Sequence, residues 1–191
     1  MEIMMKLSKY IFIPFILVLP LISSAQKDDM YTKEWSDSNK LKISDFRGYP
    51  TPYRNEIIYP CHSIGYYIVS PGPPIWTYEI VAELDKGCSW IKPKDTAEAI
   101  AQLQYTQDMF DLVEVYARRI RKAYQLRTFF SSETFDSIHD EYERKMYNAF
   151  VSLEQQEHDI GIKVFIDLEQ NIKEQLDSLK AYKNPIFKIE H

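Results

Sequence analysis

Histidine and cysteine are the first side chains to consider for nucleophilic or metal chemistry in this chain. His62 directly follows Cys61, and such a pair could act as an activated nucleophile or bind a metal. No third residue at a fixed spacing supports either use. His139 stands beside Asp140 and Glu141 on the polar face of an expected helix, where a solvated cluster is the simpler interpretation. We therefore interpret both histidines as structural.

The two cysteines, Cys61 and Cys88, allow one further kind of chemistry. In an exported protein an even pair can close a disulfide, which here would cross the predicted sheet. Two buried thiols are the alternative, because a lone pair of cysteines defines no disulfide framework. The sequence leaves both states open.

A basic series follows later in the chain: Arg118, Arg119, Arg121, Lys122 and Arg127. Such a stripe could contact an anionic surface. Glu114 precedes Arg118 by four residues, which is the favourable orientation for an ion pair on a helix. We therefore expect a solvated helix face of paired charges.

Three blocks of residues keep their order along most of the chain. The first is residues 41–48 (LKISDFRG), with Trp35 a few positions ahead. The second is residues 89–92, followed by Gln107, Phe110, Asp111, Glu114, residues 116–118 and residues 121–122. The third is residues 154–161, around His158. In these blocks the chain resembles a bacterial family of unknown function described as predicted secreted zinc-dependent proteases. That family reads roughly L-x-W-x-D-F-x-G, then H-E-Q-x-H-F-D-I-x-E-x-x-A-R-x-x-R-K, then E-T-x-H.

The H-E-x-x-H core of the family pattern is a zinc site. Two histidines four residues apart on a helix hold one Zn²⁺, and the glutamate beside the first deprotonates the bound water. Zinc lowers the pKa of that water to about 7. Aligning the retained residues of the second block places Tyr105 and Met109 at the two histidine positions and Thr106 at the glutamate.

These three replacements remove the chemistry of the motif. A phenol ionises only near pH 10, a thioether is soft and uncharged, and a threonine hydroxyl does not act as a base towards water. His158 matches the family's third histidine, but Gln155 stands where relatives carry glutamate. The resemblance therefore implies a protease-like scaffold without catalytic residues or metal, a pseudoenzyme. A resemblance that is only architectural would leave the site equally empty.

Two other functions stay open. An active metal-dependent peptidase or hydrolase would need a non-standard ligand set within about 2.0–2.2 Å of one zinc ion. His158 with His139 is one such set, and the nearby Glu154 and Glu157 supply further candidates. A pure interaction module would instead expose an aromatic patch of a few hundred Å², near Trp76 or among the 14 tyrosines.

The elements that must position these residues begin with a sheet. Residues 63–69 and 76–84 predict two strands on either side of a Pro-Gly-Pro-Pro breaker, and residues 88–91 predict a third. Together they suggest an antiparallel meander. Residues 49–60 contain three prolines and predict a loop.

Helical periodicity follows from about residue 94. A first helix runs without Gly or Pro to residue 128, a second covers residues 133–158 after a Ser131 or Ser132 cap, and a third ends at Asn184. The expected core-facing residues are Ile100, Leu103, Phe110, Val113, Ala117, Ile120, Ile138, Tyr142, Met146, Ala149, Val164, Leu168, Ile172 and Leu176. This order predicts an α+β domain, with a small N-terminal antiparallel sheet packed against a C-terminal set of three long helices. The resemblance adds a zincin-like layout.

The start of the chain predicts a cleavable signal peptide. Lys6 and Lys9 precede an apolar stretch over residues 10–22, and the small residues 23–25 follow. The apolar stretch is about 13 residues long and is shorter than the roughly 20 that cross a bilayer. We place the cleavage before Gln26 and expect an exported protein, periplasmic or secreted, without an integral membrane span.

The remaining chain divides into a flexible leader over residues 26–34, a single zinc-protease-like domain over residues 35–184 and a tail over residues 185–191. The net charge of −5, without a long basic block, argues against a nucleic-acid partner. We expect a non-catalytic binding or structural domain without a cofactor, whose partner is a protein or another envelope component. Zinc would be present only in the hydrolase alternative.

Overall fold

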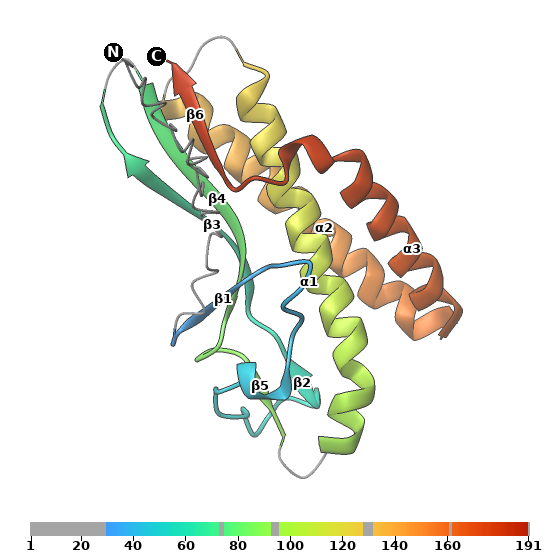
Figure 1. Ribbon diagram of the computed structural model, residues 1–191. Coiled ribbons are helices and arrows are strands. Elements are labelled where there is room, and N and C mark those ends of the chain that lie inside the picture. Colours follow the sequence, from blue (N-terminus) through green and yellow to red (C-terminus); the bar gives the residue numbers. More distant parts are fainter. Residues whose placement is uncertain (1–29, 73–74, 93–95, 128–131, 161, 191) are drawn as a thin grey trace, which may run out of the picture.

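The computed structural model contains a four-stranded antiparallel sheet, a two-stranded sheet and three long helices (Figure 1). The structure describes residues 30–72, 75–92, 96–127, 132–160 and 162–190. The backbone alone is described for residues 132–133, 154, 156–160, 162–166 and 190. The predicted signal peptide and residues 26–29 of the predicted leader lie outside the described residues. The α+β class is confirmed.

The central strand of the larger sheet is β4 (Ile75–Asp85). One of its edges pairs with β3 (His62–Ser70), as the sequence predicts. Its other edge pairs with β1 (Thr32–Glu34) at one end and with β6 (Ile186–Glu190) at the other. The helices pack against one face of this sheet (Figure 1).

Two strands replace segments that the sequence predicts as irregular. The last residues of the predicted leader form β1, and the predicted tail forms β6, so the sheet is not built from N-terminal residues alone. Both strands are short and are stabilised by hydrogen bonds to β4, which local periodicity does not encode. Phe187 and Ile189 of β6 are buried in the core, consistent with alternation across the strand.

The predicted meander is wrong in its third strand. The segment beginning at Cys88 forms β5 (Trp90–Ile91), which pairs with β2 (Ile58–Tyr59) rather than with β4. A tight turn directs the chain away from β4, because the Asp85 carboxylate accepts hydrogen bonds from the Gly87 and Cys88 backbone amides. The partner β2 lies within the predicted loop.

The three predicted helices are confirmed as α1 (Thr96–Gln125), α2 (Ser132–Ile160) and α3 (Ile162–Ser178). Two short 3₁₀ helices, η1 (Ile43–Asp45) and η3 (Lys180–Tyr182), also lie within the described residues. The predicted apolar faces pack in the core, except for two residues. Ile100 is 58 % exposed because it lines a cleft and does not face the sheet. The side chain of Val164 lies outside the described residues.

Between β1 and β6, the edge of β4 is completed by loops and by one side chain. The Ile80 amide donates to the Pro185 carbonyl at 3.0 Å, and the Trp35 amide donates to the Ala82 carbonyl at 2.9 Å. Nε of Arg121 donates to the Ile80 carbonyl at 2.8 Å. Arg121 therefore satisfies a strand carbonyl that faces no neighbouring strand.

Arg121 belongs to a buried charge network on α1. The Glu114 carboxylate accepts hydrogen bonds from Arg118 and Arg121, each at 2.9 Å. Arg118 is 3 % and Arg121 1 % exposed. The predicted pairing is correct, but the expected solvated face is wrong for these two residues, because the network is enclosed between the helix, the sheet and the backbone of residues 176–183.

Candidate functional site

The degenerate motif positions Tyr105, Thr106 and Met109 lie along α1. Thr106 and Met109 are buried, and Tyr105 is partly buried. The Thr106 hydroxyl donates to the Gln102 carbonyl one turn earlier, at 3.0 Å. Helical threonine often makes this local bond, and it directs the hydroxyl towards the helix backbone.

The metal-ligand alternative receives no support from the described side chains. They contain no group of three or more His, Cys, Asp or Glu residues that could hold a metal ion. His139 is engaged elsewhere, with its Nε2 atom 3.1 Å from a Glu143 carboxylate oxygen. The side chains of His158, Glu154 and Glu157 lie outside the described residues, so the proposed ligand set is untested.

The Cys61–His62 pair is structural, as expected. Cys61 forms a disulfide with Cys88, with the two Cα atoms 5.8 Å apart, so no free thiol stands beside the imidazole. The His62 ring stacks on Phe110 with the ring centroids 5.3 Å apart. Burial lowers the pKa of His62 to about 3, which keeps the ring neutral.

Residues of the first two resemblance blocks meet at the surface of α1. The Gln107 side chain accepts a hydrogen bond from the Leu41 amide at 2.7 Å and donates to the Asp111 carboxylate at 2.6 Å. The same carboxylate oxygen accepts a hydrogen bond from the Trp35 indole at 2.6 Å. These bonds hold residues 35–41 against the helix.

Two further residues of the first block are also structural. The buried Asp45 carboxylate pairs with Lys33 at 2.8 Å and accepts the Lys42 amide at 2.8 Å. Gly48 packs tightly, because a Cβ atom at this position would lie 2.6 Å from the Gly87 carbonyl oxygen. The block therefore locks β1 and the following loop onto the turn after β4.

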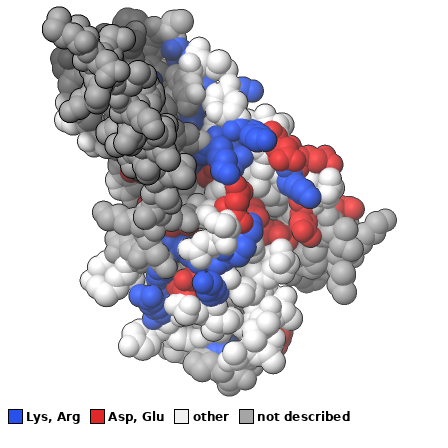
Figure 2. All heavy atoms as spheres, viewed as in Figure 1, with Lys and Arg blue, Asp and Glu red and all other residues white. Residues whose placement is uncertain are grey.

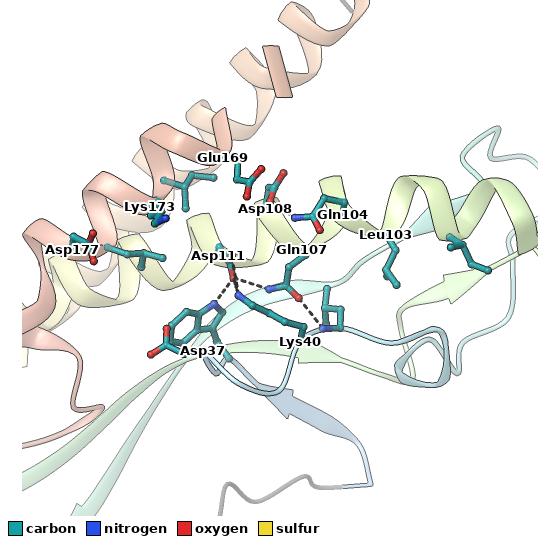
Figure 3. A pocket seen from close by; sticks show the side chains of 15 residues that line it. Asp37, Lys40, Leu103, Gln104, Gln107, Asp108, Asp111, Glu169, Lys173 and Asp177 are labelled. Carbon is teal, nitrogen blue, oxygen red and sulfur yellow. Dashed lines mark hydrogen bonds and ion pairs between the residues drawn. The ribbon is translucent and has the colours of Figure 1, made fainter. Parts of the chain in front are cut away.

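A cleft lies between α1, α3 and residues 35–41, with a volume of about 690 Å³ (Figure 3). We call it the α1–α3 cleft. Its lining residues are Trp35, Asp37, Lys40, Leu41, Ile100, Leu103, Gln104, Gln107, Asp108, Asp111, Glu169, Ile172, Lys173, Leu176 and Asp177. Apolar and charged side chains thus share one concave surface.

Carboxylates outnumber cations in the α1–α3 cleft, with five carboxylates and two lysines among the lining residues. Lys40 pairs with Asp111 at 3.2 Å. Asp37 pairs with Lys183, which lies outside the lining. Figure 2 shows Asp and Glu interspersed with Lys and Arg over this side of the molecule. The remaining lining charges are three carboxylates and one ammonium group.

Asp108 is the most unusual group in the cleft. It is only 4 % exposed, and its carboxylate accepts one hydrogen bond, from Gln104 at 3.0 Å. Figure 3 shows this carboxylate beside that of Glu169 across the cleft. Burial raises the pKa of Asp108 to about 6, and the negative charges of Glu169 and Asp111 add to the effect. At neutral pH, Asp108 is therefore a poorly solvated anion.

Sequence reasoning missed this cleft. Asp108 occupies the variable position of the family motif, and Glu169 lies on the polar face of the third predicted helix. The available signal was the spacing of Gln104, Asp108 and Asp111, which places three polar side chains on one side of a helix otherwise rich in apolar residues. These side chains face α3 only because the two helices pack together, and local spacing does not encode that packing.

Tyr66 and Tyr67 of β3 are 40 % and 46 % exposed. The other position expected for the aromatic patch of an interaction module is Trp76. This side chain is half-buried, packs against the core and stacks on Tyr78 with the ring centroids 6.3 Å apart. Tyr49 and Tyr53 are each 94 % exposed but lie in the loop before β2. None of the described helices combines the length and the hydrophobicity of a membrane-spanning segment.

No protein-family model matches the chain, and no curated protein or solved structure matches it. The functional interpretation therefore depends on the geometry of the α1–α3 cleft and on the resemblance in the sequence.

Proposed function

We propose that the protein is an exported, non-catalytic binding domain whose α1–α3 cleft receives a positively charged group of its partner. The observation that carries the proposal is the buried Asp108 carboxylate, which lies beside the Glu169 carboxylate across the cleft. The resemblance to predicted zinc-dependent proteases supports a zincin-like scaffold that has lost its metal. In this proposal the scaffold binds a partner and does not cleave it.

The residue types at the motif positions support a non-catalytic role. A buried thioether at Met109 and a phenol at Tyr105 are poor substitutes for the imidazoles that hold zinc. The Thr106 hydroxyl, bonded to the helix backbone, has no basicity with which to activate water. The retained residues of the motif instead bind other parts of the scaffold.

The size and lining of the cleft favour a lysine or arginine side chain of a protein partner. Ligand pockets typically enclose about 300–1,000 Å³, and this cleft falls within that range. The apolar side chains of Leu103, Ile172 and Leu176 suit the methylene stem of such a residue. Its charged end would then meet Asp108 and Glu169 in a partly desolvated site, where electrostatic attraction is strongest.

Isothermal titration with two peptides tests this proposal. One peptide carries several lysines, and the other carries glutamate at the same positions. We expect the lysine peptide alone to bind. Asp108→Asn should weaken binding about tenfold because it removes a buried charge, which is about 1.4 kcal/mol. Glu169→Gln should weaken it less, by about two- to fivefold, because Glu169 is exposed.

Glu174→Gln is the matched control, because Glu174 is an exposed residue of α3 outside the cleft lining. It should leave affinity within about twofold, as expected for a solvated charge. Equal binding of the two peptides, or equal losses in Glu169→Gln and Glu174→Gln, would refute a cation site in the cleft.

The active-hydrolase alternative has a separate test. It requires purified protein to retain stoichiometric zinc after dialysis and a peptidase activity to disappear in His158→Ala. Both results together would replace the non-catalytic proposal. Zinc-free protein without peptidase activity would remove the alternative.

A further inference from the structure

The outer edge of β3 is open among the described residues. β3 pairs with β4 along one edge, and no described strand pairs with its other edge. Figure 1 shows this second edge at the side of the sheet, beyond which no described helix or strand lies. An unpaired edge presents backbone donors and acceptors to any strand of compatible sequence.

The register identifies which backbone groups face outwards. The Asp85 amide donates to the Cys61 carbonyl at 2.9 Å, so these two residues form a hydrogen-bonded pair. Because such pairs alternate along antiparallel strands, Ser63, Gly65 and Tyr67 bond to β4, up to the register shift between Ile68 and Ser70. The amides and carbonyls of Ile64, Tyr66 and Ile68 therefore point away from β4, towards the open edge of the sheet.

The side chains along this edge are neutral and largely apolar. Tyr66, Tyr67, Ile68 and Val69 are 40 %, 46 %, 48 % and 52 % exposed. From His62 to Ser70 the strand contains no Lys, Arg, Asp, Glu or Pro. Natural edge strands are commonly protected from pairing by charged residues, proline or β-bulges. β3 lacks charged residues and proline, and its register shift between Ile68 and Ser70 lies beyond Tyr67, towards the end of the strand.

We propose that two copies of this chain associate by antiparallel pairing of their β3 edges about a two-fold axis at Tyr67. In this register, Tyr66 of one copy forms hydrogen bonds with Ile68 of the second copy, and the two Tyr67 side chains lie next to each other. Aromatic and β-branched cross-strand neighbours of this kind stabilise a sheet. The larger sheet of each copy would then continue into the other.

The features of the edge favour a second copy over a different partner. The exposed side chains of β3 are neutral. The Glu83 carboxylate beside them is buried and accepts a hydrogen bond from the Tyr67 hydroxyl at 2.8 Å, so the edge repels its own copy little although the chain carries a net charge of −5. The same outward groups of Tyr66 and Ile68 supply both halves of each hydrogen-bonded pair under two-fold symmetry. The contact involves only about five residues on each side, so the dimer should be weak. This inference does not depend on the proposed function of the cleft.

Sedimentation velocity of the mature chain over roughly a hundredfold concentration range tests the inference, because dimer formation follows mass action. We expect a monomer–dimer equilibrium in the wild-type protein. Ile68→Lys should remain monomeric throughout, because it places two like charges in the paired edge. Val69→Lys is a second edge variant, in case Ile68→Lys is poorly folded by circular dichroism. Tyr147→Lys, at a 66 % exposed position on α2, should dimerise like wild type.

Amide hydrogen exchange provides the positional readout. The outward amides of Tyr66 and Ile68 should exchange more slowly at high concentration in wild type and in Tyr147→Lys, but not in the lysine variants of the edge. A wild-type protein that stays monomeric over the whole range would overturn the inference. So would a dimer that persists in both edge variants, or one without protection at these two amides.

Discussion

Replacing Asp108 by asparagine should stabilise the folded protein at neutral pH while weakening the binding of a cation. Asp108 is buried in the wall of the α1–α3 cleft and carries a charge that its surroundings solvate poorly. Asparagine has nearly the same shape, and its carbonyl oxygen can still accept the hydrogen bond from Gln104. The substitution therefore removes the charge with little change in packing.

The magnitude follows from the pKa of Asp108, which rises from 3.8 to about 6 on folding. A shift of about two units corresponds to about 3 kcal/mol of differential stability between the two protonation states. Because folding raises the pKa, the folded protein is destabilised by ionisation of Asp108. This loss of stability is absent below pH 4, grows between pH 4 and 6 and is complete above pH 6. The cleft opens to water and a buried amide also costs free energy, so we expect a gain of about 1–3 kcal/mol at pH 7.5.

Urea unfolding at pH 7.5 and at pH 4 measures this difference. The gain in unfolding free energy should be present at pH 7.5 and nearly absent at pH 4, because wild-type Asp108 is then largely protonated in the folded state. Asp140→Asn, at an exposed position on α2, is the control and should change stability by less than about 0.5 kcal/mol. A destabilised Asp108→Asn at pH 7.5, or an equal gain at both pH values, would refute the reasoning.

Three other substitutions or treatments probe the scaffold. Glu114→Gln should destabilise the protein by about 3–5 kcal/mol in urea unfolding, because it leaves two buried guanidinium groups without their carboxylate; a loss below about 1 kcal/mol would contradict the network. Gly48→Ala should lower the melting temperature by several degrees, because the added Cβ atom would clash with backbone oxygens. Gly87→Ala is the control, because its Cβ atom would contact only a side-chain oxygen, at 3.4 Å. Reducing the disulfide between Cys61 and Cys88, 27 residues apart in sequence, should cost about 3–4 kcal/mol in a comparison of oxidised and reduced protein; unchanged stability would show that the link restrains little.

The parts of the fold predicted from sequence are those with long local patterns. The helix α1 and the strands β3 and β4 each carry an apolar periodicity over many residues, and each was predicted within a few residues of its bounds. The strands β1 and β6 are too short for a periodic pattern and are stabilised by pairing with the edge of β4. Such pairing is non-local, so a residue-by-residue interpretation cannot supply it.

The same limit explains the charge network on α1. The sequence predicts the ion pair between Glu114 and Arg118 because their spacing is local. It does not predict their burial, which depends on docking of the helix against β4 and the chain near Tyr182. The spacing of Glu114 and Arg121, two helical turns, placed both residues on one face, and that face also bears the buried Ala117. The position of these charged residues within an apolar stripe of the helix was the available indication that they are buried.

The motif residues that match the family pattern and those that differ from it have different physical roles in this structure. Gln107 and Asp111 match the resemblance pattern, and they tie the segment containing Trp35 to α1. These contacts are needed to build the domain whether or not a metal is bound. Met109 and Thr106 stand where the pattern has a ligand and a base, and both are buried. A chain that keeps the first group and replaces the second retains the folded surface beside the α1–α3 cleft, where we propose that a cation of the partner binds.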